Sequence, residues 1–432
     1  MSGLTIHDDF ERFLVDWLDE TAGPGSPDYL EETLARLDSV QQRPAWLSPS
    51  RWLPVEALTV RRFESARLAP VLVALVLLLI LAMVIVIVGS TRSRVPPPFG
   101  LAATGDFAFD AGGDIYLAQP DGTLARRIVS TPSYEFGATW SRDGSRLAYW
   151  SSAAADGRNA SLWVADADGR SPHRVTGDLT FAADTVMPAV DWSPDDRSLA
   201  FTTADGRLYV VDVDNSDLRP LGDDSLNRQD PAWSPNGSLI AFHGEGASTG
   251  IYVIGSDGSG EIKVSTGPSW PISLRLPSWS PDGQRLLYHV GNPDENDIAI
   301  ATRTGSIWSE TIVVGGPEHD SWPEFSSDAS RIAFLRSEPG HQEGHLWTAH
   351  ADGSRLSQVS DDLVGWSPFC WTPDDAGFLA PLGYLDTAIG DEDLPGFLVI
   401  SADGNAPTSF VLSDGRVAFA ACSWQRLALD AG

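Results

Sequence analysis

The sequence predicts a mainly β fold, a ring of seven β-sheets, preceded by a small α-helical region and one transmembrane helix. A motif that recurs from about residue 105 onward, with strand-forming residues in every copy, predicts the ring. An uncharged apolar stretch over residues 68–91 predicts the helix. Repeats of about 40–50 residues with strand-like content are typical of β-propeller blades, which bury their faces only when stacked in a ring.

The stretch over residues 68–91 reads LAPVLVALVLLLILAMVIVIVGST and is bracketed by Arg67 and Arg92. Its core is long enough to cross a bilayer as a helix, which takes about 20 apolar residues. A cleavable signal peptide would start near the N-terminus and carry a shorter apolar region. We therefore predict a permanent single-pass anchor in the cell membrane.

Basic residues flanking the span predict its orientation. Four arginines precede it and two follow it: Arg51, Arg61, Arg62 and Arg67, then Arg92 and Arg94. Cytoplasmic flanks carry the excess of basic residues. The N-terminus is predicted to be cytoplasmic, and the large C-terminal domain extracytoplasmic.

Residues 1–45 are predicted to form a cytoplasmic helical hairpin. Five apolar side chains fall at i, i+3, i+4, i+7 and i+8, the spacing of one helix face: Phe10, Phe13, Leu14, Trp17 and Leu18. This face is a candidate surface for a cytoplasmic partner; the alternative is a helical pair that only shields itself. A Pro/Trp-rich tether follows over residues 46–67, and a Pro-rich stalk over residues 92–104 links the span to the propeller, residues 105–430.

The repeated motif is Trp-Ser-Pro-Asp-Gly followed by a short apolar run. Its key aromatic residues lie 41–53 positions apart: Trp140, Trp192, Trp233, Trp279, Phe325, Trp371 and, in a truncated copy, Trp424. An inner strand should end at each aromatic residue, and Pro-Asp-Gly should form a tight turn because Gly accepts positive φ. The recurrence of the turn aspartates indicates turn capping rather than catalysis. The departures are Arg142 for Pro and Asp196 and Asp375 for Gly.

The two ends of the propeller predict how it closes. Residues 105–131 resemble a unit that lacks its first strand, and the C-terminal SWQRLALD supplies one. Six complete units and this composite give seven blades; six blades is the alternative, if the last piece only decorates the rim.

The motif resembles the TolB-type, WD40-like (PD40) propeller repeats over residues 105–430. The layout of inner helices, one span and an outer domain also resembles transmembrane anti-sigma factors, which implies a sigma factor as the partner of residues 1–45. Their zinc-binding His-x3-Cys-x2-Cys signature is absent, because residues 1–68 contain no cysteine.

Composition and motifs narrow the chemistry. The formal net charge of -30 repels phosphate backbones, so we expect no nucleic-acid partner. We expect no cofactor or metal: DVDNSD over residues 212–217 resembles the start of a calcium loop but lacks its Gly and its final Glu. The sequence GASTG around Ser248 precedes a strand and not the helix of a nucleophile elbow, so we expect a loop serine. Cys370 and Cys422 either form a disulfide or remain two buried thiols.

Loops that enter the inner strands should build the mouth of the central channel. They carry mixed charges and two aromatic residues that can hold a protein, peptide or glycan: Glu135, Asp184, Arg228, Asp230, Arg275, His319, Asp320, Trp322 and Trp366. The alternative is that these residues cap loops and seal the channel. The predicted role is non-catalytic binding, as scaffold or sensor. An anti-sigma-like regulator and a propeller hydrolase or lyase remain alternatives.

Overall fold

The computed structural model describes residues 96–154, 157, 159–180, 189–266, 277–291, 296–339, 344–359, 364, 369–381, 396–402, 408–411 and 423–429. The chain divides into two units, Met1–Arg92 and Ser93–Gly432, and the described residues all lie in the second. The predicted hairpin, tether and transmembrane helix therefore lie outside the described residues. Within the described residues, no helix is long and apolar enough to cross a membrane.

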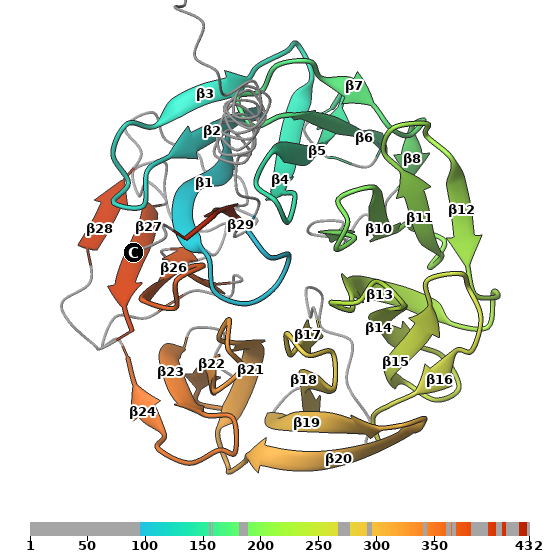
Figure 1. Cartoon of the computed structure of the whole chain (residues 1–432), viewed down its shortest axis with the longest axis vertical. Helices are drawn as coiled ribbons and strands as arrows, with labels where there is room; N and C mark the ends of the chain where they lie inside the picture. The colour runs from blue at the N-terminus through green and yellow to red at the C-terminus, as the bar shows by residue number, and fades with distance from the viewer. Residues whose placement is uncertain are drawn as a thin grey trace, which may run out of the picture. The chain divides into compact units, whose positions relative to one another are not determined.

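Seven antiparallel sheets form a ring, which confirms the mainly β, seven-bladed prediction (Figure 1). Blade 1 holds β4 (Tyr134–Trp140), β5 (Arg146–Ser152), β6 (Asn159–Asp166), β7 (His173–Arg174) and β8 (Leu179–Thr180), which also pairs with β6. Blade 2 holds β9 (Val190–Trp192), β10 (Ser198–Thr202), β11 (Leu208–Asp212) and β12 (Leu218–Leu221). Blade 3 holds β13 (Asn227–Trp233), β14 (Leu239–Glu245), β15 (Gly250–Gly255) and β16 (Ile262–Lys263).

The remaining blades follow the same order from the centre outwards. Blade 4 holds β17 (Ser278–Trp279), β18 (Arg285–Gly291), β19 (Asn296–Thr304) and β20 (Ile307–Val314). Blade 5 holds β21 (His319–Phe325), β22 (Arg331–Ser337), β23 (His345–His350) and β24 (Ser357–Gln358). Blade 6 holds β25 (Cys370–Trp371), β26 (Gly377–Pro381), β27 (Gly396–Ser401) and β28 (Thr408–Val411).

Blade 7 joins strands from the two ends of the propeller, as predicted. Its inner strand is β29 (Ser423–Leu427), which pairs with β1 (Ala103–Ala111), followed by β2 (Asp114–Ala118) and β3 (Arg126–Val129). The Trp424 ring lies 5.3 Å from the Phe107 ring, edge to face. Pairing at this point completes the ring without an open edge (Figure 1).

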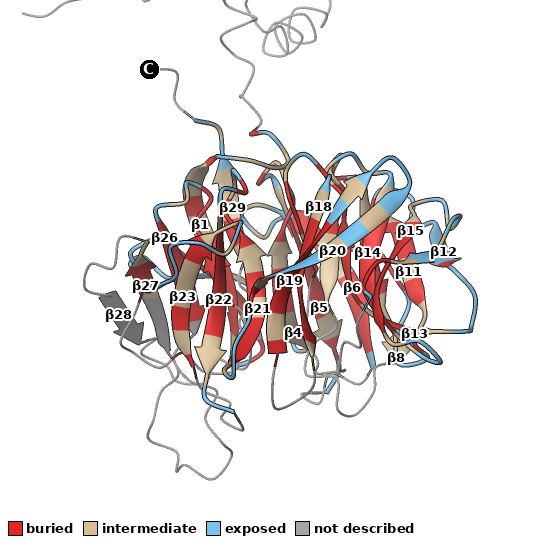
Figure 2. Cartoon of the chain, turned by 90° about the horizontal axis from the view of Figure 1, so that it is seen from below, coloured by how far each residue is buried: buried red, intermediate tan, exposed pale blue. Residues whose placement is uncertain are grey.

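The apolar core lies between neighbouring blades. Seven clusters of buried residues occupy the seven blade interfaces of the described ring, and the key aromatic residues belong to them. For example, Trp150 of blade 1 packs with Phe201 of blade 2, their rings 5.5 Å apart. Figure 2 shows that buried residues follow the strands, while exposed ones gather at turns.

At six of the seven blade interfaces, the residue before the key aromatic of one blade forms a hydrogen bond with the aromatic residue of the next blade. Backbone N–H groups donate to side chains in four pairs: Trp140 to Ser423 (2.8 Å), Trp233 to Asp191 (2.7 Å), Phe325 to Ser278 (3.2 Å) and Trp371 to Glu324 (3.2 Å). Indole Nε1 groups donate to backbone carbonyls in three pairs: Trp192 to Thr139 (3.2 Å), Trp279 to Ala232 (3.1 Å) and Trp371 to Glu324 (3.4 Å). These contacts join the inner strands around the ring.

The turn after each inner strand repeats one hydrogen-bond network. In blade 4, the Ser280 hydroxyl donates to Asp282 (2.6 Å) and accepts the Arg285 N–H (2.9 Å), while Asp282 accepts the Gln284 N–H (2.9 Å). Asp143, Asp195, Asn236, Asp328 and Asp374 accept equivalent bonds. The repeated acidic residues therefore cap turns.

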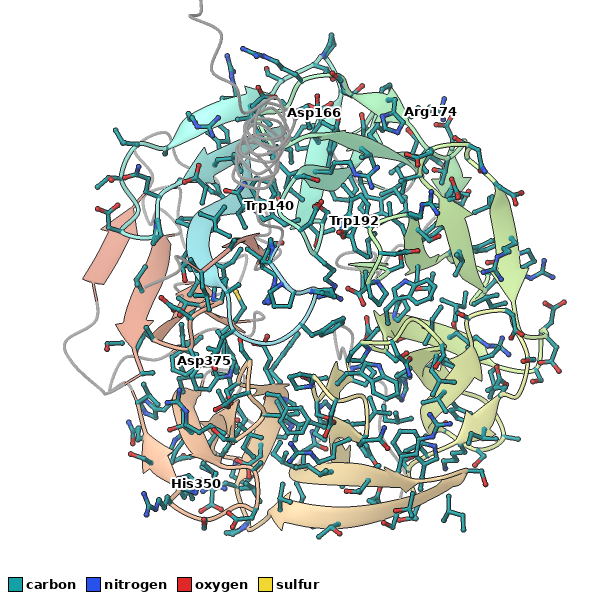
Figure 3. The ribbon with its side chains drawn as sticks, in the orientation of Figure 1. Trp140, Asp166, Arg174, Trp192, His350 and Asp375 are labelled. Carbon is teal, nitrogen blue, oxygen red and sulfur yellow. The ribbon has the colours of Figure 1, made fainter. Side chains whose placement is uncertain are left out.

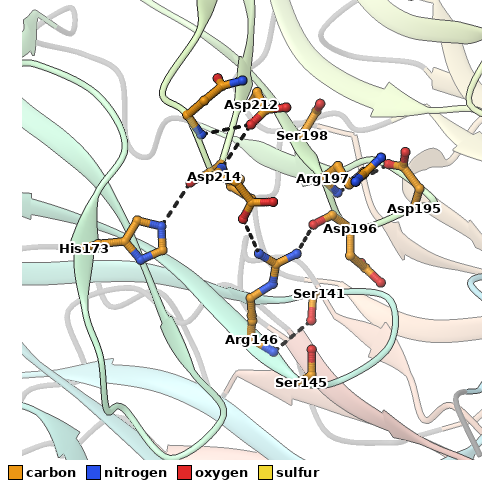
Figure 4. A network of polar contacts seen from close by, with 12 residues as sticks. Ser141, Ser145, Arg146, His173, Asp195, Asp196, Arg197, Ser198, Asp212 and Asp214 are labelled. Atoms are coloured by element: carbon orange, nitrogen blue, oxygen red, sulfur yellow. Dashed lines mark hydrogen bonds and ion pairs between the residues drawn. The ribbon is translucent and has the colours of Figure 1, made fainter.

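Arginines at the start of the second strand reach across to the next blade. The Arg146 guanidinium donates to the Asp196 carbonyl, lies 3.3 Å from Asp214 and covers the Trp192 ring at 5.3 Å (Figure 4). Arg285 and Arg331 repeat this contact: they donate to the carbonyls of Ala329 and Asp375 (3.0 Å each) and lie over Phe325 and Trp371.

Departures from the turn motif occur in matched pairs in adjacent blades. Arg142 and Ser327 stand where other copies have proline, so they carry a backbone N–H. The following blades place Asp196 and Asp375 where other copies have glycine, at φ 57° and 56°. Asp196 accepts the Arg142 N–H (2.6 Å), and Asp375 accepts the Ser327 N–H (2.8 Å). The left-handed backbone cost of each aspartate is thus offset by capping its neighbour's turn.

We expect the pair at Ser327 and Asp375 to be energetically coupled. Asp375→Gly alone should lower the free energy of unfolding by about 1 kcal/mol, because the lost acceptor outweighs the relief of positive φ. In a Ser327→Pro background, where no N–H remains, the same change should be neutral or stabilising. Denaturant unfolding followed by tryptophan fluorescence measures the cycle.

The matched control is Gly237→Asp, because a side chain at Gly237 (φ 73°) would place its Cβ 3.7 Å from Pro194, which has no N–H to cap. This change should destabilise the protein by about 1 kcal/mol. Equal costs for Asp375→Gly in both backgrounds would contradict the pairing.

Cys370 is buried and disulfide-bonded. The only other cysteine of the sequence is Cys422, which lies outside the described residues. We expect non-reducing peptide mapping of protein isolated from its native organism to show a disulfide between Cys370 and Cys422. Reduction should cost about 4 kcal/mol of stability, from the loop that the bond closes. A Cys370→Ser, Cys422→Ser variant should be insensitive to reductant; free thiols in freshly isolated protein would refute the prediction.

Candidate functional site

A cavity of about 390 Å³ lies at the centre of the ring. Most of its lining comes from the inner strands of blades 1 to 6 and the residues just before or after them. Further lining residues are Ile251 of β15, Tyr288 and His289 of β18, Arg426 of blade 7, and Pro98, Phe99 and Gly100 ahead of β1. We call this space the channel cavity. We call the end of the ring that carries the turns after the inner strands the turn face. In Figure 3, Trp140 and Trp192 lie on the inner side of the ring, whereas Asp166, Arg174 and His350 lie toward its rim.

Bulges in the inner strands shape the wall. Residues three positions before the key aromatic take positive φ in three blades: Gly137 (65°), Asp230 (52°) and Trp322 (57°). The strand registers shift at these points, and all three residues line the channel cavity. A non-glycine residue held at positive φ costs about 1–2 kcal/mol. Such strain is often found at functional sites.

The cavity holds paired charges beside aromatic rings. The Arg142 guanidinium lies 2.5 Å from Asp191, whose other oxygen accepts the Trp233 N–H. Burial raises the pKa of Asp191 above its usual range, and it raises the pKa of Glu324 to about 8. Trp233, Trp279 and Phe325 supply apolar wall. This lining suits a ligand with both apolar and polar groups.

The described part of the predicted stalk lies in the mouth of the cavity on the turn face. The Arg142 guanidinium stands 4.6 Å from the centre of the Phe99 ring. Arg426 donates to the carbonyls of Pro97 (3.1 Å) and Gly100 (2.5 Å). The Ala102 N–H donates to the Pro373 carbonyl (2.9 Å), which ties the segment to blade 6.

Of the nine predicted mouth residues, Asp230 and Trp322 line the channel cavity. Two others are buried in local networks. Glu135 accepts bonds from Thr131 and Ser151. Arg228 is 1% exposed and donates to Glu261 (2.7 and 2.9 Å).

His319 and Asp320 both belong to β21 of blade 5, and both side chains are buried. His319 contacts Asn296 at 3.0 Å, and Asp320 forms a two-pronged pair with Arg336 (2.7 Å for each bond). Asp184, Arg275 and Trp366 lie outside the described residues, as do Phe10, Phe13, Leu14, Trp17 and Leu18.

Two further features considered in the sequence are the serine of the GASTG motif and a possible metal site. Ser248 lies in the loop before β15, where the Lys263 ammonium donates to its hydroxyl at 3.1 Å. Across the described segments, no group of three His, Cys, Asp or Glu side chains is arranged to hold a metal ion.

The sequence analysis missed the residues that define the cavity: Phe99, Arg142, Asp191, Glu324 and Arg426. Two signals were present. Asp191 and Glu324 occupy the position before the key aromatic, where a strand residue faces the neighbouring blade, and Arg142 replaces a turn proline. Arg426 contacts Pro97 and Gly100 across more than 300 residues of sequence, and Phe99 meets Arg142 of another blade, so neither contact left a local pattern.

A buried carboxyl next to the cavity predicts a pH dependence. Asp110 is 2% exposed and accepts the Gly137 N–H (3.2 Å), and burial raises its pKa to about 8. Between its unfolded pKa and about pH 8 the folded state holds the extra proton, so stability falls as pH rises, by up to about 1.4 kcal/mol per pH unit. Asp110→Asn keeps an acceptor for Gly137 and should flatten this slope. Unfolding series at pH 5 to 8 measure it; parallel slopes for both proteins would contradict the assignment.

Comparison with known proteins agrees with this geometry. A Tol-Pal system protein TolB from Anaeromyxobacter dehalogenans is 34% identical over 170 residues, 38% of this chain and 37% of that protein. An uncharacterised peptidase, YuxL, from Bacillus subtilis is 27% identical over 111 residues, 25% of this chain and 16% of that protein. The chain thus spans well under half the length of the curated relatives it matches.

A solved oligogalacturonate lyase from Vibrio parahaemolyticus superposes with a TM-score of 0.51 and 16% identity, covering 72% of this chain and 90% of that one. This likeness concerns the fold alone. The model of the PD40 family, described as the TolB beta propeller domain, matches residues 114–374. Since that match covers more than half of the chain, the protein belongs to the TolB beta propeller domain family.

Proposed function

We propose that this protein is a non-catalytic binding module whose extracytoplasmic propeller holds a protein or peptide partner in the channel cavity. The predicted span over residues 68–91 anchors it in the cell membrane. Paired charges beside aromatic walls support recognition of a polypeptide, which presents both kinds of group. A relative is named as a Tol-Pal system protein, which also supports a protein partner.

The single observation that supports a sensor role is that Phe99, close in sequence to the predicted span, lines the channel cavity. Pro98, Phe99 and Gly100 line the cavity, and they belong to the segment that leads from the predicted span. Phe99 lies eight positions after the end of that span, a reach of at most about 28 Å along the chain. A ligand that contacts Phe99 would therefore act on the chain close to the membrane. The predicted inner helices, residues 1–45, would pass the state of the cavity to a cytoplasmic partner, as in the anti-sigma-like layout.

Two observations support an extracytoplasmic position for the propeller. Cys370 is disulfide-bonded, and disulfides persist in oxidising compartments outside the cytosol. The arginine bias around the predicted span orients the C-terminal domain to the same side.

The binding role can be tested by site-specific photo-crosslinking in intact cells. A photoreactive phenylalanine analogue replaces Trp322, which lines the cavity, or Ile307, which is 71% exposed on β20 of blade 4. We expect position 322 to give one dominant adduct with an extracytoplasmic protein, and position 307 to give none. Mass spectrometry identifies the adduct, and a membrane-impermeant protease establishes its side of the membrane.

Equal adducts at both positions, or none at 322 in folded protein, would contradict binding in the channel. Turnover of an ester, peptide or glycan that is lost in a Trp322→Ala variant would instead favour the hydrolase or lyase alternative.

A further inference from the structure

Pro96 to Gly100 enters the channel mouth as a short proline-rich segment that bends at Pro98, Phe99 and Gly100. A proline fixes φ near −65° and pushes the residue before it to an extended conformation, so Pro96 and Pro97 favour polyproline II geometry. The bend that follows brings the carbonyls of Pro97 and Gly100 within reach of one nitrogen of Arg426. A polyproline II helix has no internal hydrogen bonds and leaves its carbonyls free to accept. Gly100 ends the segment at φ 89°, a conformation that suits glycine.

Two arginines from different blades hold this segment. Arg426, from β29 of blade 7, donates to carbonyls three residues apart, those of Pro97 and Gly100. Arg142, from the turn of blade 1, faces the Phe99 ring at 4.6 Å, within cation–π range. Arg426 thus binds the backbone of the segment, and Arg142 contacts its aromatic side chain.

The surroundings match known ways of binding proline-rich chains. Domains that recognise such segments use aromatic-lined grooves and donors to the carbonyls. Trp233, Trp279 and Phe325 line the cavity beside Pro98 and Phe99. Burial, together with the charge of Arg142, lowers the pKa of Arg426 to about 10, so the mouth concentrates positive charge next to peptide carbonyls.

We propose that the channel mouth on the turn face is a binding site for a short proline-rich segment that bends at an aromatic residue. Residues 96–100 are its intramolecular occupant, and a partner's segment of the same chemistry displaces them. The inference rests on the proposed function, since it names the class of partner that the channel takes. Displacement frees the chain between β1 and the predicted span, which is the step that a sensor needs.

A tethered occupant sets the threshold for exchange. A short linker gives it a millimolar effective concentration, so a free peptide of equal intrinsic affinity competes poorly. Emptying the mouth by mutation should therefore reveal binding that the wild-type protein masks.

The test uses the full-length protein in nanodiscs and a fluorescein-labelled peptide, Val-Pro-Pro-Pro-Phe-Gly, followed by fluorescence anisotropy. The vacated variant carries Pro97→Ser, Pro98→Ser and Phe99→Ser, and an unchanged melting profile shows that it folds. We expect this variant to bind the peptide at least tenfold more tightly than the wild type does. A single Phe99→Ser variant should give an intermediate value.

Two controls assign the site. Replacing the peptide's phenylalanine by serine should remove most of the binding, and adding Arg426→Met to the vacated variant should do the same. Absence of binding to a folded vacated variant, or equal binding to wild type and variant, would overturn the proposal. If the peptide does not bind but a partner is still crosslinked at position 322, the proposed channel-binding function is retained and only the proline-rich ligand is rejected. If the peptide binds but no adduct forms at position 322, the proline-rich site is retained and the proposed binding partner in the cavity is rejected.

Discussion

The structure depends on one contact that recurs between neighbouring blades. The residue before the key aromatic of one blade binds the aromatic residue of the next, through a side-chain oxygen at Ser423, Asp191, Ser278 and Glu324 or through a backbone carbonyl at Thr139 and Ala232. Since each contact involves two blades, no inner strand is positioned alone. The bond from Trp140 to Ser423 links blade 7 to blade 1, and apolar packing of Trp424 with blade 6 closes the ring. A single blade would leave both faces of its sheet uncovered.

Contacts between adjacent blades also compensate for departures from the repeat. Arg142 exposes a backbone N–H that proline would lack, and the next blade supplies Asp196 to accept it. The same substitution places a guanidinium in the mouth of the cavity, where it meets Phe99 and Asp191. One change to the motif therefore altered a turn, a blade interface and the candidate site together. Comparing adjacent copies, rather than each copy with an average, reveals this coupling.

The sequence predicted the fold well because the fold is local in each repeat. The aromatic spacing placed every inner strand, and the incomplete end units predicted the pairing of β29 with β1. The candidate site was predicted less well, because side-chain direction depends on non-local pairing. Arg336 draws Asp320 into the sheet, and Glu261 draws in Arg228, whereas bulges turn Asp230 and Trp322 toward the cavity. The spacing of residues along a loop contains none of this information.

The shared sheet of blade 7 also has a consequence for biosynthesis. Phe107 pairs with Trp424, so the two halves of this sheet leave the ribosome far apart in time. At about 5–20 residues per second the interval is roughly 15–60 s. During that period β1 to β3 can pack against blade 1, but the inner edge of β1 has no partner strand and the apolar face that later meets blade 6 stays open to water. A chain that ends before β29 would leave the edge of β1 unpaired permanently. We expect such a chain to be degraded by proteases that recognise exposed apolar segments.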